Sequence, residues 1–391
     1  MEIIVIGKPA INVYLPLVEF PQEGDLFNIT AKNESVGNIG ATSACLLAKW
    51  GMSTHFSGVV GNDSYADKIR QTFMEHKVNT KFMEVNFETG TSTNYIILNT
   101  KSGVVSKILY NDTEATLNKF KYDFIPDFAV IDGTDLPGAW WLLNTNGSCK
   151  TVFYGRVGDK DTVNVSKKCT WVVCTQQFVE MMTKTKLEDS QEAYIDIYQK
   201  IVDISGKSNY IVLLKNRKIL YSIDGQVKLV PEMKINVADL SSFDSIFVGA
   251  LSFCLANDVK IDDAIKFADT AAAISISRIG EVGAIPTVDE VLDNSGLREK
   301  LGLANKGDIH KHEDNAPKPI GEAAELAASE PEQPVAMPEA NATQDAAFGT
   351  QPTESVEMPQ LQQTEAQPVE MPQPQQPVQQ EEPNMFDNPN V

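Results

Sequence analysis

The chain alternates short runs of β-branched and other apolar residues with longer stretches of helical periodicity. The runs bounded by turn-forming residues, which are typical of buried strands, are Glu2–Gly7, His55–Val60, Phe128–Asp132, Thr151–Tyr154, Trp171–Cys174 and Tyr210–Leu214. The stretches with apolar positions at helical spacing are Ser64–His76, Glu192–Ile204, Asp244–Asn257 and Ile261–Ile279. This order predicts a three-layer α/β/α fold, in which a mostly parallel sheet is covered by helices on both faces.

Two further segments have a pattern that does not fit this sheet. Residues 12–36 and 91–110 alternate polar and apolar positions, and the second segment contains a turn signal at Lys101-Ser-Gly that is typical of a hairpin. We therefore expect strands that stand apart from the main layers. The alternative is an ordinary edge of the main sheet.

Composition divides the chain into two parts. The formal net charge is −20, and residues 306–391 alone carry 16 acidic side chains against three lysines, together with 13 of the 20 prolines. A segment with Phe348 and Phe386 as its only aromatic residues buries too little apolar surface to offset the entropy lost on ordering. We expect one globular unit over residues 1–302 and a disordered, acidic Pro/Gln/Glu-rich tail over residues 303–391.

Charge and composition also exclude several classes of function. Net negative charge in both parts argues against binding to a nucleic-acid backbone. The chain has neither a basic leader nor an apolar run long enough to span a bilayer, so we expect a cytoplasmic protein without a membrane segment. Four histidines are too few for a zinc cage, and we expect no metal site built from protein ligands. The scattered cysteines, typical of buried free thiols, are Cys45, Cys149, Cys169, Cys174 and Cys254.

Candidate chemistry concentrates in the segment Asn236–Leu251, where Asp244 begins an apolar helix. The segment resembles the C-terminal signature of the ribokinase/PfkB carbohydrate kinases, Asp-Thr-Thr-Gly-Ala-Gly-Asp-Ala-Phe, and a divergent resemblance extends in order over most of the globular part. The resemblance implies a ribokinase-like fold in which Asp244 is the base that deprotonates a sugar hydroxyl. The residues leave a second interpretation open, because an Asp at a helix start also caps unpaired backbone N–H groups.

The glycine-rich turn that cradles phosphate in this family is altered here. Its Gly-Ala-Gly positions fall on Ser241, Ser242 and Phe243. Backbone N–H groups at a helix N-terminus attract anions, and glycine lets the backbone approach the phosphate closely. The resemblance implies an anion hole at these three residues, although a Phe beside the base makes a close approach harder.

Two segments near the N-terminus are similar to the family's substrate-binding elements. Val36–Gly51 is similar to the Gly-Gly-x-x-x-Asn-x-Ala motif, and Ser57–Ser64 is similar to Gly-x-Val-Gly-x-Asp. The residues that the resemblance assigns to substrate binding are Asn12, Gly37, Asn38 and Thr42. Asn12 replaces the family's sugar-binding Asp, which removes a strong charged acceptor for a sugar O–H group.

The nucleotide-binding motifs of the family are altered as well. The Thr-x-Gly-x-x-Gly turn falls on Leu213–Lys218, which contains no glycine, and the Asn-x-x-Glu motif falls on Cys174–Val179, which contains no carboxylate. Lys215 and its basic neighbours contact phosphate in one interpretation and belong to a solvated turn in the other. Gly283 and Ala284 match the family's Gly-Ala beside the adenine pocket, or they only end the preceding helix.

Two functions from different classes fit these residues. The altered motifs favour a degenerate kinase, or pseudokinase, that acts as a ligand-binding or partner-recruiting scaffold, because phosphoryl transfer depends on positioning and neutralising the phosphates. The alternative is an active kinase that uses ATP and Mg²⁺ to phosphorylate a sugar or nucleoside, with Asp244 as base. In either case the resemblance implies that the strands within 12–36 and 91–110 form a lid over the substrate and the contact of a homodimer.

The acidic tail contains a repeated short motif. A Val-x-Met-Pro core is repeated around Met337, Met358 and Met371. Repeated apolar anchors in a solvated chain suit capture by a grooved protein partner, in which several weak sites act together. The alternative is a tail that only keeps the protein soluble, and pull-downs with and without residues 306–391 distinguish the two.

Overall fold

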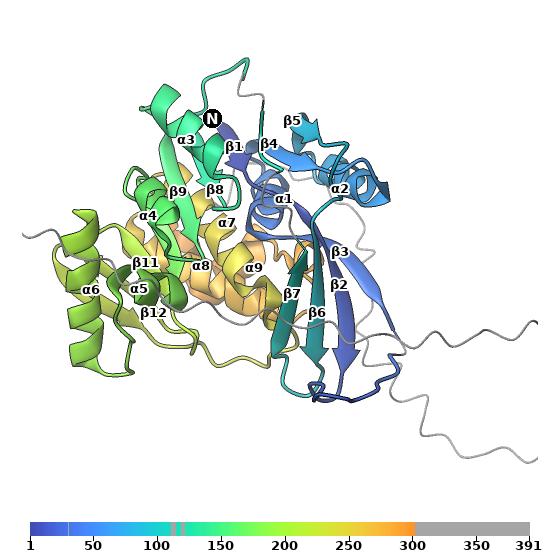
Figure 1. Ribbon diagram of the computed structural model, residues 1–391. Coiled ribbons are helices and arrows are strands. Elements are labelled where there is room, and N and C mark those ends of the chain that lie inside the picture. The colour runs from blue at the N-terminus through green and yellow to red at the C-terminus, as the bar shows by residue number, and fades with distance from the viewer. Residues whose placement is uncertain (30, 111–114, 119–121, 302–391) are drawn as a thin grey trace, which may run out of the picture. The chain divides into compact units, whose positions relative to one another are not determined.

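The computed structural model describes residues 1–301 except residue 30, residues 111–114 and residues 119–121 (Figure 1). The predicted tail, its Val-x-Met-Pro repeats and the predicted end of the globular unit at residue 302 lie outside the described residues. The domain boundaries and the tail partner therefore stay predictions.

The main sheet has nine strands within the described residues, in the order β13-β12-β11-β10-β9-β8-β1-β4-β5. Its strands are β1 (Glu2–Ile6), β4 (Ser53–Val60), β5 (Asn79–Val85), β8 (Phe128–Ile131), β9 (Lys150–Gly155), β10 (Trp171–Thr175), β11 (Tyr210–Leu213), β12 (Ile219–Ile223) and β13 (Gln226–Val230). All neighbours from β11 to β5 are parallel, and β12 and β13 join antiparallel. Each of the six strands predicted from the sequence is present, which confirms the mostly parallel sheet.

Helices cover both faces of this sheet (Figure 1). One layer holds α1 (Ile39–Lys49), α2 (Ser64–Glu75), α7 (Phe243–Ala256), α8 (Ile261–Ile276) and α9 (Val288–Ser295), and the other holds α3 (Leu136–Thr145), α4 (Lys160–Ser166), α5 (Gln176–Thr183) and α6 (Gln191–Ser205). Successive side chains of β1 point to opposite faces, so Ile3 and Val5 enter one core while Ile4 and Ile6 enter the other. The three-layer prediction is confirmed.

A second sheet stands apart from the main one, as predicted for residues 12–36 and 91–110 (Figure 1). Its strands, which we call the lid, are β3 (Asn33–Gly37), β2 (Ala10–Leu17), β6 (Thr93–Asn99) and β7 (Val105–Tyr110), in that order. The hairpin between β6 and β7 turns at Gly103, whose φ of 69° favours glycine. The alternative, an ordinary edge of the main sheet, is wrong.

The described residues include all five cysteines, and their helices can be checked for membrane spans. All five thiols are buried and unpaired, and burial raises the pKa of Cys149 to about 12. No helix of the described part combines the length and apolar character that crossing a membrane requires. The cytoplasmic location stays a prediction.

Candidate active site

A cavity of about 380 Å³ lies where β9, β10 and β11 end, facing the start of α7 and the lid strand β7. In open α/β sheets, ligands bind at the carboxyl ends of the strands, and this cavity has that position. Its polar lining includes Asn38, Lys107, Arg156, Lys215, Asp244 and Glu281. Three of these six, Asn38, Lys215 and Asp244, are site residues that the sequence predicts.

Asp244 is held by a partner from the main sheet. It is the second residue of α7, and its Oδ2 accepts a hydrogen bond of 2.5 Å from the hydroxyl of Tyr154 at the end of β9. Burial raises the pKa of Asp244, while the Tyr154 hydrogen bond and the charges of Lys107 and Arg156 oppose that rise. The N-cap position of α7 is Ser242, so the alternative interpretation of Asp244 as a helix cap is wrong.

The turn before α7 has internal partners for most of its polar groups. Asp239 accepts from the Ser241 amide at 2.8 Å through Oδ1 and from the Ser241 hydroxyl at 2.8 Å through Oδ2. The Ser242 hydroxyl pairs with Ser275 of α8 at 3.0 Å, and the Phe243 amide donates to the carbonyl of Leu240. Ser241 and Phe243 line the cavity. An anion hole at this turn stays a prediction, and it requires the Ser241 and Phe243 amides to leave these acceptors.

The predicted substrate-binding residues gather around one carboxylate. Asn12 Nδ2 donates to Glu281 Oε1 at 2.9 Å, and Thr42 Oγ1 donates to Glu281 Oε2 at 3.1 Å. Gly37 makes room for this arrangement, because a Cβ there lies only 2.0 Å from Asn12 Nδ2. Asn38 lines the cavity itself. Asn12 and Thr42 are fully buried and do not line it.

Glu281 and Lys107 are site residues that the sequence reasoning missed. The Glu281 side chain is only 2% exposed, and Lys107 Nζ lies 3.3 Å from its Oε1. Lys107 Nζ also donates to the carbonyl of Ser241 at 3.2 Å, so this residue of β7 joins the lid to the turn before α7. The sequence does contain a signal for Glu281, which is a lone acid in the apolar segment after α8. A buried charge needs a partner, so such an acid indicates a polar site.

Basic side chains from the ends of two sheet strands also line the cavity. Lys215 follows β11 and Arg156 follows β9, and both line the cavity together with Gln176. The Gln176 side chain accepts from the Lys215 amide at 3.2 Å and donates to Glu180 at 2.8 Å. Of the other basic residues in this turn, Arg217 also lines the cavity and pairs with Glu232, whereas Lys218 pairs with Asp189 away from it.

Gly283 and Ala284 lie outside the lining of this cavity. They belong to a short 3₁₀ turn, η2 (Val282–Ala284), and do not line this cavity. The chain after the turn packs beside the end of α1, where Lys49 Nζ donates to the carbonyl of Ile285 at 2.9 Å. Their role at a nucleotide stays a prediction for which the cavity offers no support.

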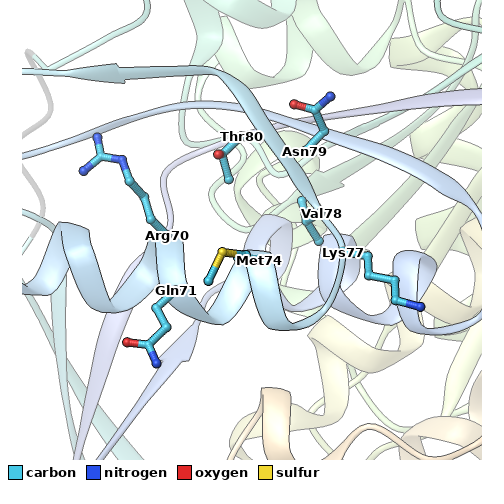
Figure 2. Close-up of a pocket in the computed structure, with 7 residues that line it drawn as sticks. All are labelled: Arg70, Gln71, Met74, Lys77, Val78, Asn79 and Thr80. Atoms are coloured by element: carbon cyan, nitrogen blue, oxygen red, sulfur yellow. The ribbon is translucent and has the colours of Figure 1, made fainter.

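A second hollow, of about 690 Å³, lies where α2 ends and β5 begins (Figure 2). The residues that line it are Arg70, Gln71, Met74, Lys77, Val78, Asn79 and Thr80. None of these seven is a carboxylate, so this surface has no group to act as a general base. The candidate active site is therefore the cavity beside Asp244.

Comparison with known proteins identifies the family of the chain. The model of the family described as pfkB family carbohydrate kinase matches residues 2–288. A deoxyribokinase of Salmonella typhi is 22% identical over 316 residues, which cover 76% of this chain and 100% of the relative.

Solved structures give the same fold. A ribokinase from Cryptococcus neoformans in complex with ADP has a TM-score of 0.63 at 17% identity, over 75% of this chain and 98% of that chain. Ribokinase of Arabidopsis thaliana, complexed with ribose and ATP, has a TM-score of 0.58 at 17% identity, with the same coverage of 75% and 98%. At these identities the likeness shows the fold alone, and it confirms the ribokinase-like prediction.

Proposed function

The chain belongs to the pfkB family of carbohydrate kinases, and from this premise we propose that it is an active, ATP-dependent kinase of a pentose sugar. The observation that carries the proposal is the carboxylate of Asp244, which lines the cavity at the start of α7 with cationic side chains near it. The curated relatives named deoxyribokinase and ribokinase support this interpretation over a degenerate kinase.

In this proposal Asp244 removes the proton from the hydroxyl that is phosphorylated. Tyr154 occupies Oδ2, so Oδ1 is the oxygen that accepts the proton. A general base of this kind must be ionised. Burial and the charge of Glu281 raise the pKa of Asp244, and the charges of Lys107 and Arg156 favour its ionised form. Lys107 also brings positive charge to the carbonyl side of the turn before α7.

In this proposal the basic residues that line the cavity bind the phosphates of a nucleotide. Bound ATP supplies the transferable γ-phosphoryl group, and the side chains placed to hold its phosphates are Arg156 and Lys215. The described residues contain no group of three His, Cys, Asp or Glu side chains that could hold a metal ion. Mg²⁺ commonly binds through substrate phosphates, waters and one or two carboxylates, so this donor set is compatible with Mg²⁺ carried by the nucleotide.

A coupled assay of ADP release tests the proposal. Full-length protein with Mg²⁺-ATP is expected to turn over D-ribose or 2-deoxy-D-ribose with a kcat on the order of 1–10³ s⁻¹. Nucleosides and hexoses serve as comparison substrates. Turnover of a nucleoside alone contradicts the pentose assignment, and no turnover of any substrate contradicts the kinase itself.

A degenerate kinase is the second candidate, and one observation favours it. The Ser241 amide, which the resemblance places in the anion hole, already donates to Asp239. A protein of this kind binds ATP or sugar in calorimetry without turning over, which the coupled assay separates from the first candidate.

Tyr154→Phe is expected to shift the acid limb of the kcat–pH profile to higher pH. The hydroxyl lowers the pKa of Asp244 by stabilising its charged form, so its removal lets burial raise that pKa further. The base is then protonated, and activity lost, at a higher pH. Profiles of kcat against pH measure this shift.

Tyr221→Phe is the matched control for this variant. The Tyr221 hydroxyl also donates to a carboxylate, that of Asp262 at 2.6 Å, but neither residue lines the cavity. Its profile should coincide with that of the wild type. An acid limb that stays in place in Tyr154→Phe is incompatible with Asp244 as the base.

We further propose that the outer face of the lid forms a homodimer. Tyr95 of β6 pairs with Ile108 of β7, and these side chains are 43% and 60% exposed, with Tyr110 at 53% beside them. Large apolar side chains gathered on one exposed face mark an interaction site. Analytical ultracentrifugation is expected to give twice the chain mass, and a monomer at all concentrations contradicts the dimer.

A further inference from the structure

The described residues do not fill the hydrogen-bonding capacity of Glu281. An ionised carboxylate offers about four acceptor sites. Oε1 accepts from Asn12 and lies beside Lys107, and Oε2 accepts from Thr42. One acceptor site on Oε2 is left, and Glu281 is among the residues that line the cavity.

Lys107 has one N–H donor that the described residues do not use. An ammonium group carries three N–H donors, and two of them are directed to the Ser241 carbonyl and to Glu281 Oε1. The residue lines the same cavity and its side chain is 29% exposed. The pair therefore presents one donor and one acceptor to a ligand, which is what a hydroxyl group needs because it accepts and donates at once.

The side-chain oxygen of Asn94, in the same hydrogen-bond network, lacks a donor among the described residues. Asn94 of β6 is 1% exposed, and its Nδ2 donates to Asn12 Oδ1 at 2.8 Å and to Asn38 Oδ1 at 2.9 Å. Among the described residues its Oδ1 has no hydrogen-bond donor. An unmet buried acceptor is costly. Asn94 does not line the cavity itself, but Asn38, which accepts its hydrogen bond, does.

We propose that Glu281 and Lys107 recognise a substrate hydroxyl other than the one that is phosphorylated, an inference that rests on the proposed kinase function. Asn12 and Thr42 are then positioning residues, which fix the carboxylate of Glu281 instead of contacting the sugar. Glu281 thereby supplies the charged acceptor that position 12 lacks. Glu281 lies 269 residues after Asn12 in the sequence.

The test measures D-ribose binding to the full-length protein by calorimetry, without nucleotide. Glu281→Gln replaces one acceptor oxygen by a donor and removes the charge, so Kd for D-ribose is expected to rise by about ten- to a hundredfold. In the coupled assay the loss should appear in KM more than in kcat, because Asp244 is intact. Lys107→Met, on a partly exposed strand, should weaken ribose binding in the same direction.

Two comparisons make the result specific. In a series of D-ribose, 2-deoxy-D-ribose and 3-deoxy-D-ribose, the analogue that lacks the recognised hydroxyl should bind wild type and Glu281→Gln alike. Glu34→Gln is the matched control, since Glu34 is another lid-side carboxylate paired with lysines but does not line the cavity. It should bind ribose as the wild type does.

The outcomes separate this inference from the function on which it rests. If both variants fold, as their melting curves show, and bind D-ribose like the wild type, the inference is overturned while the kinase stands. If the wild-type protein binds ATP but no pentose, the proposed substrate class is overturned and the inference with it.

Discussion

Asp244→Asn lowers kcat for the pentose by about 10²–10⁴-fold, the contribution expected of a positioned general base. The amide keeps the size of the side chain and can still accept the hydroxyl of Tyr154, so the geometry of the cavity is retained. What it loses is the ability to take a proton. The measurement is kcat and KM in the coupled assay, with ATP affinity from calorimetry expected to change little.

Asp67→Asn is the control for this substitution. Asp67 is also an acid in the first turn of a helix, α2, but its side chain is 83% exposed and it lies outside the cavity. The control variant should keep full activity. Full activity of Asp244→Asn would show that the carboxylate of Asp244 is structural only.

Phe247→Ala destabilises the protein by about 3–5 kcal/mol, the usual cost of removing a buried phenyl group. Phe247 is fully buried in α7, the helix that carries Asp244, and its ring stacks on Phe243 with centroids 6.5 Å apart. The ring belongs to the buried core around α7, so its loss leaves a cavity. For a domain of this size the melting temperature is expected to fall on the order of 10 °C.

Phe87→Ala removes the same ring from the surface. The Phe87 side chain is 78% exposed, so its loss should change the melting temperature by little. Calorimetric melting of both variants checks the pair. Equal melting temperatures would mean that α7 does not pack in the core as described.

The sequence predicts the central strands well because each is buried on both faces. β1, β8 and β11 consist almost wholly of apolar residues, so a short apolar run between turns is enough to identify them. The edge strands β5 and β13 mix exposed polar residues with apolar ones and therefore give no such run. For this reason the pattern does not predict them. It does not predict β12 either, although β12 is apolar and buried.

The candidate site is predicted only where one local segment carries the signal. Asp244 and Asn38 follow from motifs that are contiguous in the chain, and both line the cavity. Glu281 and Tyr154 do not, because each acts through a partner that is far away in sequence, 269 and 90 residues respectively. Such pairs arise from tertiary packing, which periodicity and spacing along one sequence do not encode.

The altered phosphate turn is another part of the site that the sequence predicts only in part. The sequence identifies that its glycines are replaced, but it does not reveal that Asp239 accepts from the amide and hydroxyl of Ser241. It also does not reveal that Tyr14 of the lid reaches the Ser241 hydroxyl at 2.9 Å. These contacts define what a bound phosphate must displace.

We propose that this chain transfers a phosphoryl group from ATP to a pentose hydroxyl. Phosphorus NMR of a reaction containing the full-length protein, Mg²⁺-ATP and D-ribose or 2-deoxy-D-ribose tests it most directly. We expect a sugar phosphate ester and ADP to accumulate in equal amounts, and both to form about 10²–10⁴-fold more slowly with Asp244→Asn. Unchanged ATP with every pentose, or ADP and free phosphate without a sugar ester, would contradict it.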